Sequence, residues 1–493
     1  MRDLLERNDY SADGISRLGI DLGMGVRARD IPALLYAIEP VEPLATLIRL
    51  FALGQDVSAA AAELVLGKAT DDLVHAGLAR RDGDRVSPLV RLTPWRGLVL
   101  AHDADPLSDL WPEHVSGPTP AADTLLNLVA TNGGRALDLG TGCGIFALAV
   151  AASQSEVVAT DVNPAALRYA AMNAGLNDVT NVVVRPGSYF EPVAGESFDL
   201  ILSNPPFVIS PESDLLFRHS GFGRDEVSRQ VVRDAAERLS EGGFAYVLVN
   251  WVQPPTSGWM TVLADWLEET GCDAVCLLHG IEDPVSYAVR WNVREQQLRP
   301  DRSAATLDRW LEHFRSEGID AIGTGAVILR RSAGTPWLHG LELSGDSRGS
   351  AAPHVQAIFG GLDVLSAAGT GRSGEERLLD VRVRMRQPHR LIQQLVTRDG
   401  EYVAEPTTLV LDEGLALSTS LDPDLVAVVL RLDGSQSGRE IAQEVAAATD
   451  QDIESVATRV AAFVHTLLEL GMVEPAAHPP NELRATFLRD PQG

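Results

Sequence analysis

The residues with the clearest chemical pattern lie between Arg135 and Ile145, where the sequence reads R-A-L-D-L-G-T-G-C-G-I. The apolar stretch Ala136–Leu139 predicts a strand that carries Asp138 near its end and runs into a glycine-rich turn. Such glycines let the backbone pass close beneath a ligand. A dinucleotide loop counted from Gly140 would need its third glycine at position 145, where isoleucine stands. The pattern therefore predicts a ligand-binding turn of another class.

A second acidic residue stands at the end of the next predicted strand. Val157–Thr160 leads into Asp161, which lies 21 residues after Gly140. A carboxylate at the carboxyl end of the second strand can accept hydrogen bonds from both ribose hydroxyls of an adenosine. Asn163 and Pro164 suit the N-cap and first position of the helix that follows. A purely capping role for Asp161 is the alternative.

The third pattern is Asn204-Pro205-Pro206-Phe207, which follows the predicted strand Phe198–Ser203. An NH2 group conjugated to a carbonyl or a ring is a poor nucleophile. The side-chain carbonyl of Asn204 and the backbone carbonyl of Pro205 can accept its two hydrogens and direct its lone pair toward an electrophilic methyl group. The two prolines stiffen the loop, and Phe207 can stack on a planar acceptor.

The D-x-G-x-G-x-G turn and the N-P-P-F sequence together resemble class I S-adenosylmethionine (SAM) methyltransferases. Within that class they resemble the release factor glutamine methyltransferases and the small-domain rRNA N-methyltransferases, clearly over about residues 115–249. The resemblance implies SAM as cofactor, no metal, and Asn204, Pro205, Pro206 and Phe207 as catalytic residues. It implies cofactor contacts from Asp138, Gly140, Thr141, Gly142, Gly144, Asp161, Val162, Ser188, Tyr189 and Asn204.

One position departs from the family pattern. The segment Gly187–Pro192 reads G-S-Y-F-E-P, where the glutamine methyltransferases usually read G-D-L-F-E-P. The usual aspartate contacts the adenine amino group, and Ser188 stands in its place. We therefore expect adenine recognition that is weaker or that uses backbone atoms.

The elements around these motifs alternate between strands and helices. Further strands are predicted at Val182–Val184 and Ala245–Val249, and helices at Phe146–Ala152, Ala165–Ala174 and Asp225–Leu239. This alternation indicates an α/β fold with a parallel, doubly wound, Rossmann-like sheet. The resemblance implies the seven-stranded methyltransferase core. Three domains are expected, at residues 1–103, 104–333 and 334–493.

The flanking domains are interpreted as docking modules. Residues 44–53, 59–66 and 71–79 predict three helices, and Arg81–Arg85 predicts the turn of a hairpin, an order that resembles a winged helix. Near the C-terminus, helices are predicted at Pro423–Arg431, Ser437–Thr449 and Asp452–Leu470. They resemble either a winged helix or the PqqD-type domains that recognise peptides. Loops are predicted at Ser344–Ser350 and Ser366–Ser373, and strands at Leu378–Met385 and Thr407–Val410.

Composition restricts the partners and the compartment. The 493 residues include 68 acidic and 41 basic side chains, a formal net charge of −27. That balance speaks against a protein that coats nucleic acid through bulk electrostatics. The polar N-terminus and the absence of a long apolar run speak against a signal peptide or a membrane span. Three cysteines fit a reducing compartment, so a cytoplasmic location is expected.

Three functions remain open at this point. The first is SAM-dependent N-methylation of an amino or amide nitrogen in a protein or peptide, either of the glutamine-amide type or within a peptide-modification pathway. The second is methylation of exocyclic base amines in rRNA, tRNA or DNA, which predicts a basic surface around Phe207 from Arg218, Arg224 and Arg229. The third is a non-catalytic SAM-binding scaffold. The acceptor and the oligomeric state do not follow from the sequence.

Overall fold

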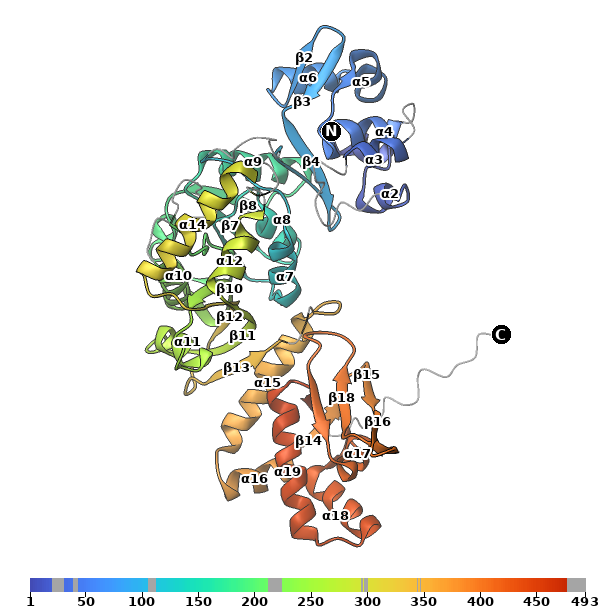
Figure 1. The fold of residues 1–493 in the computed structure, drawn as a ribbon, viewed down its shortest axis with the longest axis vertical. Helices are drawn as coiled ribbons and strands as arrows, with labels where there is room; N and C mark the ends of the chain where they lie inside the picture. Colours follow the sequence, from blue (N-terminus) through green and yellow to red (C-terminus); the bar gives the residue numbers. More distant parts are fainter. Residues whose placement is uncertain are drawn as a thin grey trace, which may run out of the picture. The chain divides into compact units, whose positions relative to one another are not determined.

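The computed structural model describes residues 1–19, 31–38, 43–104, 112–211, 224–293, 296, 300–343, 345 and 347–476. The chain forms two compact units (Figure 1). The first unit comprises residues 1–126 and 131–340, and the second comprises residues 127–130 and 341–493. The predicted domains 1–103 and 104–333 fall within the first unit, apart from residues 127–130.

The centre of the first unit is an eight-stranded sheet in the order β13-β11-β12-β10-β9-β6-β7-β8. Strands β6 to β10 run parallel to one another, whereas β12 is antiparallel to both β10 and β11. The bounds are β6 Arg135–Leu139, β7 Glu156–Asp161, β8 Val182–Pro186, β9 Phe198–Ser203, β10 Leu239–Val252, β11 Cys272–Glu282, β12 Ile322–Arg331 and β13 Leu338–Glu342.

The doubly wound α/β core is confirmed, and the sheet differs from the expectation in two respects. It is mixed, because β12 enters between β10 and β11 in the opposite direction. It has eight strands, because β13 adds to the edge beyond β11. An alternation of strand and helix patterns carries no information about strand direction at a sheet's end, so neither feature followed from the sequence.

Helices cover both faces of this sheet. Leu137 and Leu139 pack in the same apolar cluster as Val227 and Val231 of α10, whereas Asp138 accepts a hydrogen bond from α8. Because successive strand residues point to opposite faces, α8 and α10 lie on opposite sides. The helices of the core are α7 Pro120–Leu128, α8 Ile145–Ala151, α9 Pro164–Leu176, α10 Glu226–Glu237, α11 Trp259–Leu267, α12 Pro284–Trp291 and α14 Pro300–Ser316.

The N-terminal part of the first unit packs on α9. Its apolar cluster includes Leu5, Phe51 and Ala101, and Tyr169 and Met172 of α9 contact it. Its elements are α1 Arg2–Arg7, α2 Ala12–Ser16, α3 Ile31–Ala37, α4 Pro43–Leu47, a π-helical turn Ile48–Ala52, β1 Val57–Ser58, α5 Ala59–Leu66, α6 Ala69–His75, β2 Ala79–Asp82, β3 Arg85–Pro88, β4 Val90–Trp95 and β5 Leu98–Asp103. The predicted helices and hairpin are present, except that the helix expected at residues 71–79 ends at His75 and Ala79 begins β2. The winged-helix interpretation stays a prediction.

The second unit combines helices with small antiparallel sheets. One three-stranded sheet has the order β20-β14-β21, and a second three-stranded sheet has the order β15-β18-β19. The bounds are α15 Ala352–Ala368, α16 Arg372–Asp380, β14 Arg382–Met385, β15 His389–Ile392, β16 Leu395–Arg398, β17 Glu401–Ala404, β18 Thr407–Leu411, β19 Ser418–Leu421, α17 Pro423–Val429, β20 Asp433–Ser437, α18 Gly438–Thr449, α19 Ile453–Glu469 and β21 Val473–Pro475.

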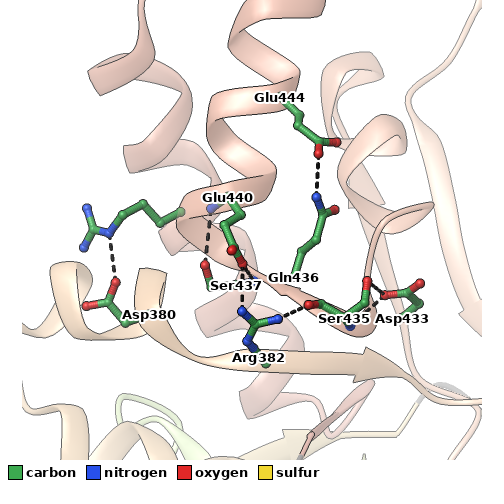
Figure 2. Close-up of polar contacts among 9 residues, drawn as sticks. Asp380, Arg382, Asp433, Ser435, Gln436, Ser437, Glu440 and Glu444 are labelled. Atoms are coloured by element: carbon green, nitrogen blue, oxygen red, sulfur yellow. Dashed lines mark hydrogen bonds and ion pairs between the residues drawn. The ribbon is translucent and has the colours of Figure 1, made fainter. Parts of the chain in front are cut away.

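Polar contacts join β14 and β20 to the start of α18, as Figure 2 shows. Ser437 caps α18 by accepting from the Glu440 N–H, while the Glu440 side chain accepts from the Ser437 N–H. Arg382 of β14 donates to Glu440 at 3.1 Å. This capping box starts the helix at the serine where the sequence predicted it.

Two expectations in the second unit are wrong. The loop expected at Ser366–Ser373 is short, because α15 extends to Ala368 and α16 begins at Arg372. The strand expected at Leu378–Met385 begins only at Arg382, because Leu378 and Leu379 belong to α16, where they are buried. The predicted helices α17, α18 and α19 are confirmed within a few residues at each end.

Candidate functional site

Four neighbouring parallel strands, β8, β7, β6 and β9, end at the same edge of the sheet. Each is followed by a segment that the sequence singled out. Backbone N–H groups of Gly140 and Thr141 both donate to the Thr160 carbonyl, at 3.0 and 2.8 Å. The turn after β6 is thereby fixed against the end of β7, and the predicted site residues are brought together at this edge.

The turn after β6 needs glycine at two positions, the exposed Gly140 and the half-buried Gly142. Gly140 and Gly142 have φ of +75° and +54°, a region that disfavours other residues. A Cβ atom added at either position would meet no atom within 4 Å. The turn is therefore open on the side toward which those Cβ atoms would point. A cofactor that lies against the turn needs this space. Gly144 is different, since a Cβ there would approach Ala170 of α9 at 3.2 Å.

Asp138 organises this turn from beneath. It is fully buried, and one carboxylate oxygen accepts from the Thr141 hydroxyl at 2.6 Å and from the Ala147 N–H at 2.9 Å. Burial raises the pKa of Asp138 to about 7, while these two hydrogen bonds act in the opposite direction. The contacts of Asp138 are thus to the turn and to α8, and its predicted contact with a cofactor stays a prediction.

Asp161 links the turn to the end of β7. Its carboxylate accepts from the Gly142 N–H at 2.9 Å and from the Asn163 N–H at 2.8 Å. Burial raises its pKa, against the effect of these backbone donors. A carboxylate has about four acceptor positions, so two remain for ribose hydroxyls. Asn163 also caps α9, as predicted, by accepting from the Ala165 N–H.

Two more segments reach the same edge. The Gly187 N–H donates to the Asp161 carbonyl at 3.1 Å, which places the half-buried Ser188 and Tyr189 next to the end of β7. On the other side, the Asn163 side chain donates to the Glu113 carbonyl at 2.9 Å. Val162 lies between these segments with 56% of its surface exposed, and can offer an apolar contact to an adenine ring.

The N-P-P-F segment begins beside the glycine turn. Ser203 pairs with Leu139 across the parallel strands, and its hydroxyl donates to the Leu139 carbonyl at 3.1 Å. Asn204 and Gly140 are the first residues after the ends of the neighbouring strands β9 and β6, so they lie side by side at the sheet edge. The half-buried Asn204 side chain makes no hydrogen bond to any other residue that the structure describes. The Pro205 carbonyl accepts from the Phe207 N–H at 2.7 Å, which leaves it one acceptor position.

Residues that the sequence did not single out support this segment. Phe207 meets Trp291 of α12 edge-on, with ring centres 6.3 Å apart. The Ile209 N–H donates to the Tyr287 hydroxyl at 3.1 Å, and the Asn250 side chain donates to the same hydroxyl at 2.7 Å. Asn250 could have been singled out from the sequence, because it is a polar residue within the apolar run of β10. Tyr287 and Trp291 carried none, because their partner lies about 80 residues earlier.

The surface expected for a nucleic-acid acceptor involves three arginines, and the two that the structure describes each have a partner, so the basic surface itself stays a prediction. Arg224 donates to the Glu317 carbonyl at 2.9 Å, and Arg229 pairs with Asp265 at 3.3 Å. Arg218 lies outside the described residues.

Comparisons with known proteins agree with this geometry. The methyltransferase small domain family matches residues 119–264, and DUF7059, a domain of unknown function, matches residues 7–89. A release factor glutamine methyltransferase of Deinococcus radiodurans is 33% identical over 206 residues, which cover 38% of this chain and 70% of that protein. One of Xylella fastidiosa is 39% identical over 132 residues, covering 24% of this chain and 48% of that protein.

The chain thus spans about half the length of several curated relatives that it matches. Among solved structures, the YcgJ protein from Bacillus subtilis is 16% identical with a TM-score of 0.29, covering 43% of this chain and 99% of that one. SAM is the methyl donor that the matching family implies, and the open glycine turn and Asp161 fit it. The chain belongs to the class I SAM-dependent methyltransferases, in the family that includes the release factor glutamine methyltransferases.

Proposed function

We propose that this protein methylates the side-chain amide nitrogen of a glutamine in a protein substrate, with a peptide-chain release factor as the first candidate. The observation that carries the proposal is the position of Asn204. Its side chain, which has no hydrogen-bond partner among the residues that the structure describes, follows β9 directly beside the glycine turn. The relatives from Deinococcus and Xylella, named for release factor glutamine methylation, support the choice of acceptor.

The acceptor chemistry follows from the two carbonyls of the loop. An amide nitrogen is a poor nucleophile because its lone pair is delocalised into the carbonyl. The Asn204 side-chain carbonyl and the free acceptor position of Pro205 can each take one hydrogen of the NH2 group. That arrangement favours pyramidal nitrogen and stabilises the positive charge that develops during transfer.

The cofactor supplies an electrophilic methyl group on a sulfonium, and the chain supplies its position. Asp161 can accept hydrogen bonds from ribose hydroxyls, and the space next to Gly140 and Gly142 can receive the cofactor, as the open side of the turn supports. Phe207 and Trp291 form an aromatic wall at which a planar amide can stack. The proton of the product is released to water or a nearby carbonyl, so no histidine is assigned as a base.

A polypeptide acceptor is favoured over nucleic acid by charge. The net charge is −27, and two arginines of the predicted wing are paired with acidic side chains. Arg81 contacts Glu63 at 2.8 Å, and Arg85 contacts Asp56 at 3.4 Å. The helix α6 that would enter a groove carries Asp71 and Asp72 in its first turn. These features oppose the phosphate contacts on which nucleic-acid binding depends.

The test is methyl transfer from labelled SAM to purified release factor from the same organism, and in parallel to a cell lysate. We expect label in a protein band and, by mass spectrometry, one added methyl group on a glutamine side chain. Label found only in RNase-sensitive material would contradict the proposal. A protein label on a residue other than glutamine would retain the methyltransferase and reject the acceptor.

A further inference from the structure

The loop that carries Asn204 is held from behind by one buried hydroxyl. The backbone N–H of Ile209, two residues beyond Phe207, donates to the Tyr287 oxygen at 3.1 Å. Tyr287 is fully buried and Ile209 is 1% exposed. A buried backbone N–H needs a partner, and for Ile209 a side chain from helix α12 supplies it, 78 positions later in the chain.

The same hydroxyl is held on its other side by the sheet. The Asn250 amide group donates to the Tyr287 oxygen at 2.7 Å. Asn250 is fully buried in β10, three residues beyond Val247, which pairs with Ser203 at the end of β9. Two donors therefore meet one oxygen, the first from the acceptor loop and the second from the strand next to it. The hydroxyl thus fixes the distance between the loop backbone and the sheet edge.

The ring of Tyr287 reaches the loop by a second route. Its centre lies 6.1 Å from that of Trp291, and Trp291 meets Phe207 edge-on at 6.3 Å. On its other sides the ring contacts Trp310 at 6.5 Å and Phe314 at 6.1 Å, both from α14. The tyrosine ring is therefore immobilised by packing, and it supports the loop through the Phe207 side chain as well as through the Ile209 backbone.

We propose that Tyr287 is the positioning residue of the acceptor loop. Its hydroxyl holds the backbone at Ile209, and through it the direction of the Pro205 carbonyl and of the Phe207 ring. It touches neither the methyl group nor the acceptor nitrogen. The inference rests on the proposed function for its kinetic test only. Misplacing an acceptor by about 1 Å lowers turnover by roughly 100-fold, so one lost hydrogen bond is expected to be visible in the rate.

The variant is Tyr287→Phe in the full-length chain, which removes the hydroxyl and keeps the ring. We expect kcat for release factor methylation to fall about tenfold or more. The dissociation constant for S-adenosylhomocysteine, measured by calorimetry, should change less than about twofold, because the cofactor turn is not contacted. The matched control is Tyr10→Phe. Tyr10 is also buried, and its hydroxyl donates to the Leu92 carbonyl at 2.6 Å in a different apolar cluster.

A second readout needs no acceptor. Hydrogen exchange of the peptide that spans residues 203–211 should be faster in Tyr287→Phe and unchanged in Tyr10→Phe, because only the former frees the Ile209 amide. Unchanged exchange and unchanged kcat would overturn the inference, as would equal losses in the two variants or a parallel loss of cofactor affinity. If wild-type protein methylates no glutamine, the proposed function fails, and exchange alone decides the positioning role.

Discussion

Two aspartates at neighbouring strand ends illustrate how local environment separates residues that look alike in sequence. Asp138 is enclosed, bonded to the turn and α8, and its pKa is raised by burial to about 7. Asp161 lies at the open edge, where its carboxylate accepts from the backbone N–H groups of Gly142 and Asn163. A carboxylate that recognises ribose must face the ligand, so Asp161 is the better placed of the two.

Replacement of Asn204 by alanine tests the acceptor side of the site. The side chain has no hydrogen-bond partner within the described part of the chain, so its removal should leave the loop folded. Loss of one carbonyl that binds the amide hydrogens should lower kcat about 100-fold or more, the order seen when one stabilising partner of a transition state is removed. Turnover and the affinity for S-adenosylhomocysteine are measured on the same preparation.

The control for this variant is Asn132→Ala, which removes an exposed amide that donates to the Asp199 carbonyl away from the strand ends at issue. Its activity should equal that of the wild type. Persistent turnover in Asn204→Ala would refute the assigned role. A loss of cofactor binding would show that Asn204 binds the cofactor instead of the acceptor.

Gly142→Ala tests the cofactor side. With φ at +54°, alanine adds backbone strain of about 1 kcal/mol, and its methyl group would enter the open space over the turn. We expect the affinity for S-adenosylhomocysteine to fall about tenfold or more, as measured by calorimetry.

Gly195→Ala separates strain from occlusion. Gly195 also has positive φ, at +77°, with no atom within 4 Å of an added Cβ, and it lies in the turn before β9 rather than at its carboxyl end. The two variants should lose similar thermal stability, while cofactor affinity should fall only in Gly142→Ala. Equal affinities would show that no ligand occupies the space above Gly142.

At the scale of elements, the strands and helices from β6 to β10 were predictable because short apolar runs alternate with helical segments, of which α10 has one clear apolar face. The boundary between α10 and β10 was wrong, because Leu239, expected at the end of the helix, begins the strand. Asn163 and Pro164 begin α9 where the sequence indicated, and the apolar run of β7 ends at Asp161. If the strands are parallel, these local signals predict that Asp161 and Asn204 lie at the same edge of the sheet. The support behind the loop, from Asn250, Tyr287 and Trp291, could not be predicted, because it depends on contacts between distant segments.

Helix α15 and the turn after it show two different uses of glycine in the second unit. Gly361 lies in the middle of this helix, where a Cβ would approach the Leu468 carbonyl of α19 at 2.2 Å. The glycine permits two helices to pack closely and does not end either of them. Gly369 and Gly371, with φ of +75° and +73°, do form the break between α15 and α16. Composition alone cannot separate these two uses of glycine.

His354 of α15 gives the second unit a dependence on pH. Its Nε2–H donates to the Leu470 carbonyl at 2.7 Å, and its Nδ1 accepts from the Leu415 N–H at 3.1 Å. Burial lowers the pKa of His354 from 6.5 to about 4. The unfolded chain therefore binds the proton more readily between these values, and stability should fall as pH decreases from 6.5 to 4, by about 3 kcal/mol at most.

Hydrogen exchange of the peptides around Leu415 and Leu470, corrected for intrinsic rates, measures this change in the full chain. His354→Leu should be less stable at pH 7 and should lose the dependence between pH 6.5 and 4. His465→Asn, at a half-exposed position of α19, should keep the wild-type profile. A wild-type profile that is flat over this range would refute the buried neutral histidine.

At the scale of the whole molecule, the net charge of −27 decides what can approach the site. Arginines that could have formed a basic patch are already engaged by acidic side chains near them, such as Arg81 by Glu63 and Arg229 by Asp265. An acidic surface repels nucleic acid at long range, and this repulsion is strongest at low salt, where the charges are least screened. A polypeptide acceptor avoids this penalty where its surface is neutral or basic, because it does not carry a phosphate at every unit.

This argument predicts how RNA and the wing arginines affect turnover. Total tRNA in excess should not inhibit release factor methylation at about 50 mM salt, where phosphate contacts are strongest. The double variant Arg81→Gln with Arg85→Gln should methylate release factor at the wild-type rate, since both arginines are paired with carboxylates at the surface and such pairs contribute about 1 kcal/mol or less. Inhibition by tRNA that salt relieves, and that this double variant abolishes, would instead make the N-terminal elements an RNA-binding module and reopen the base-amine acceptor.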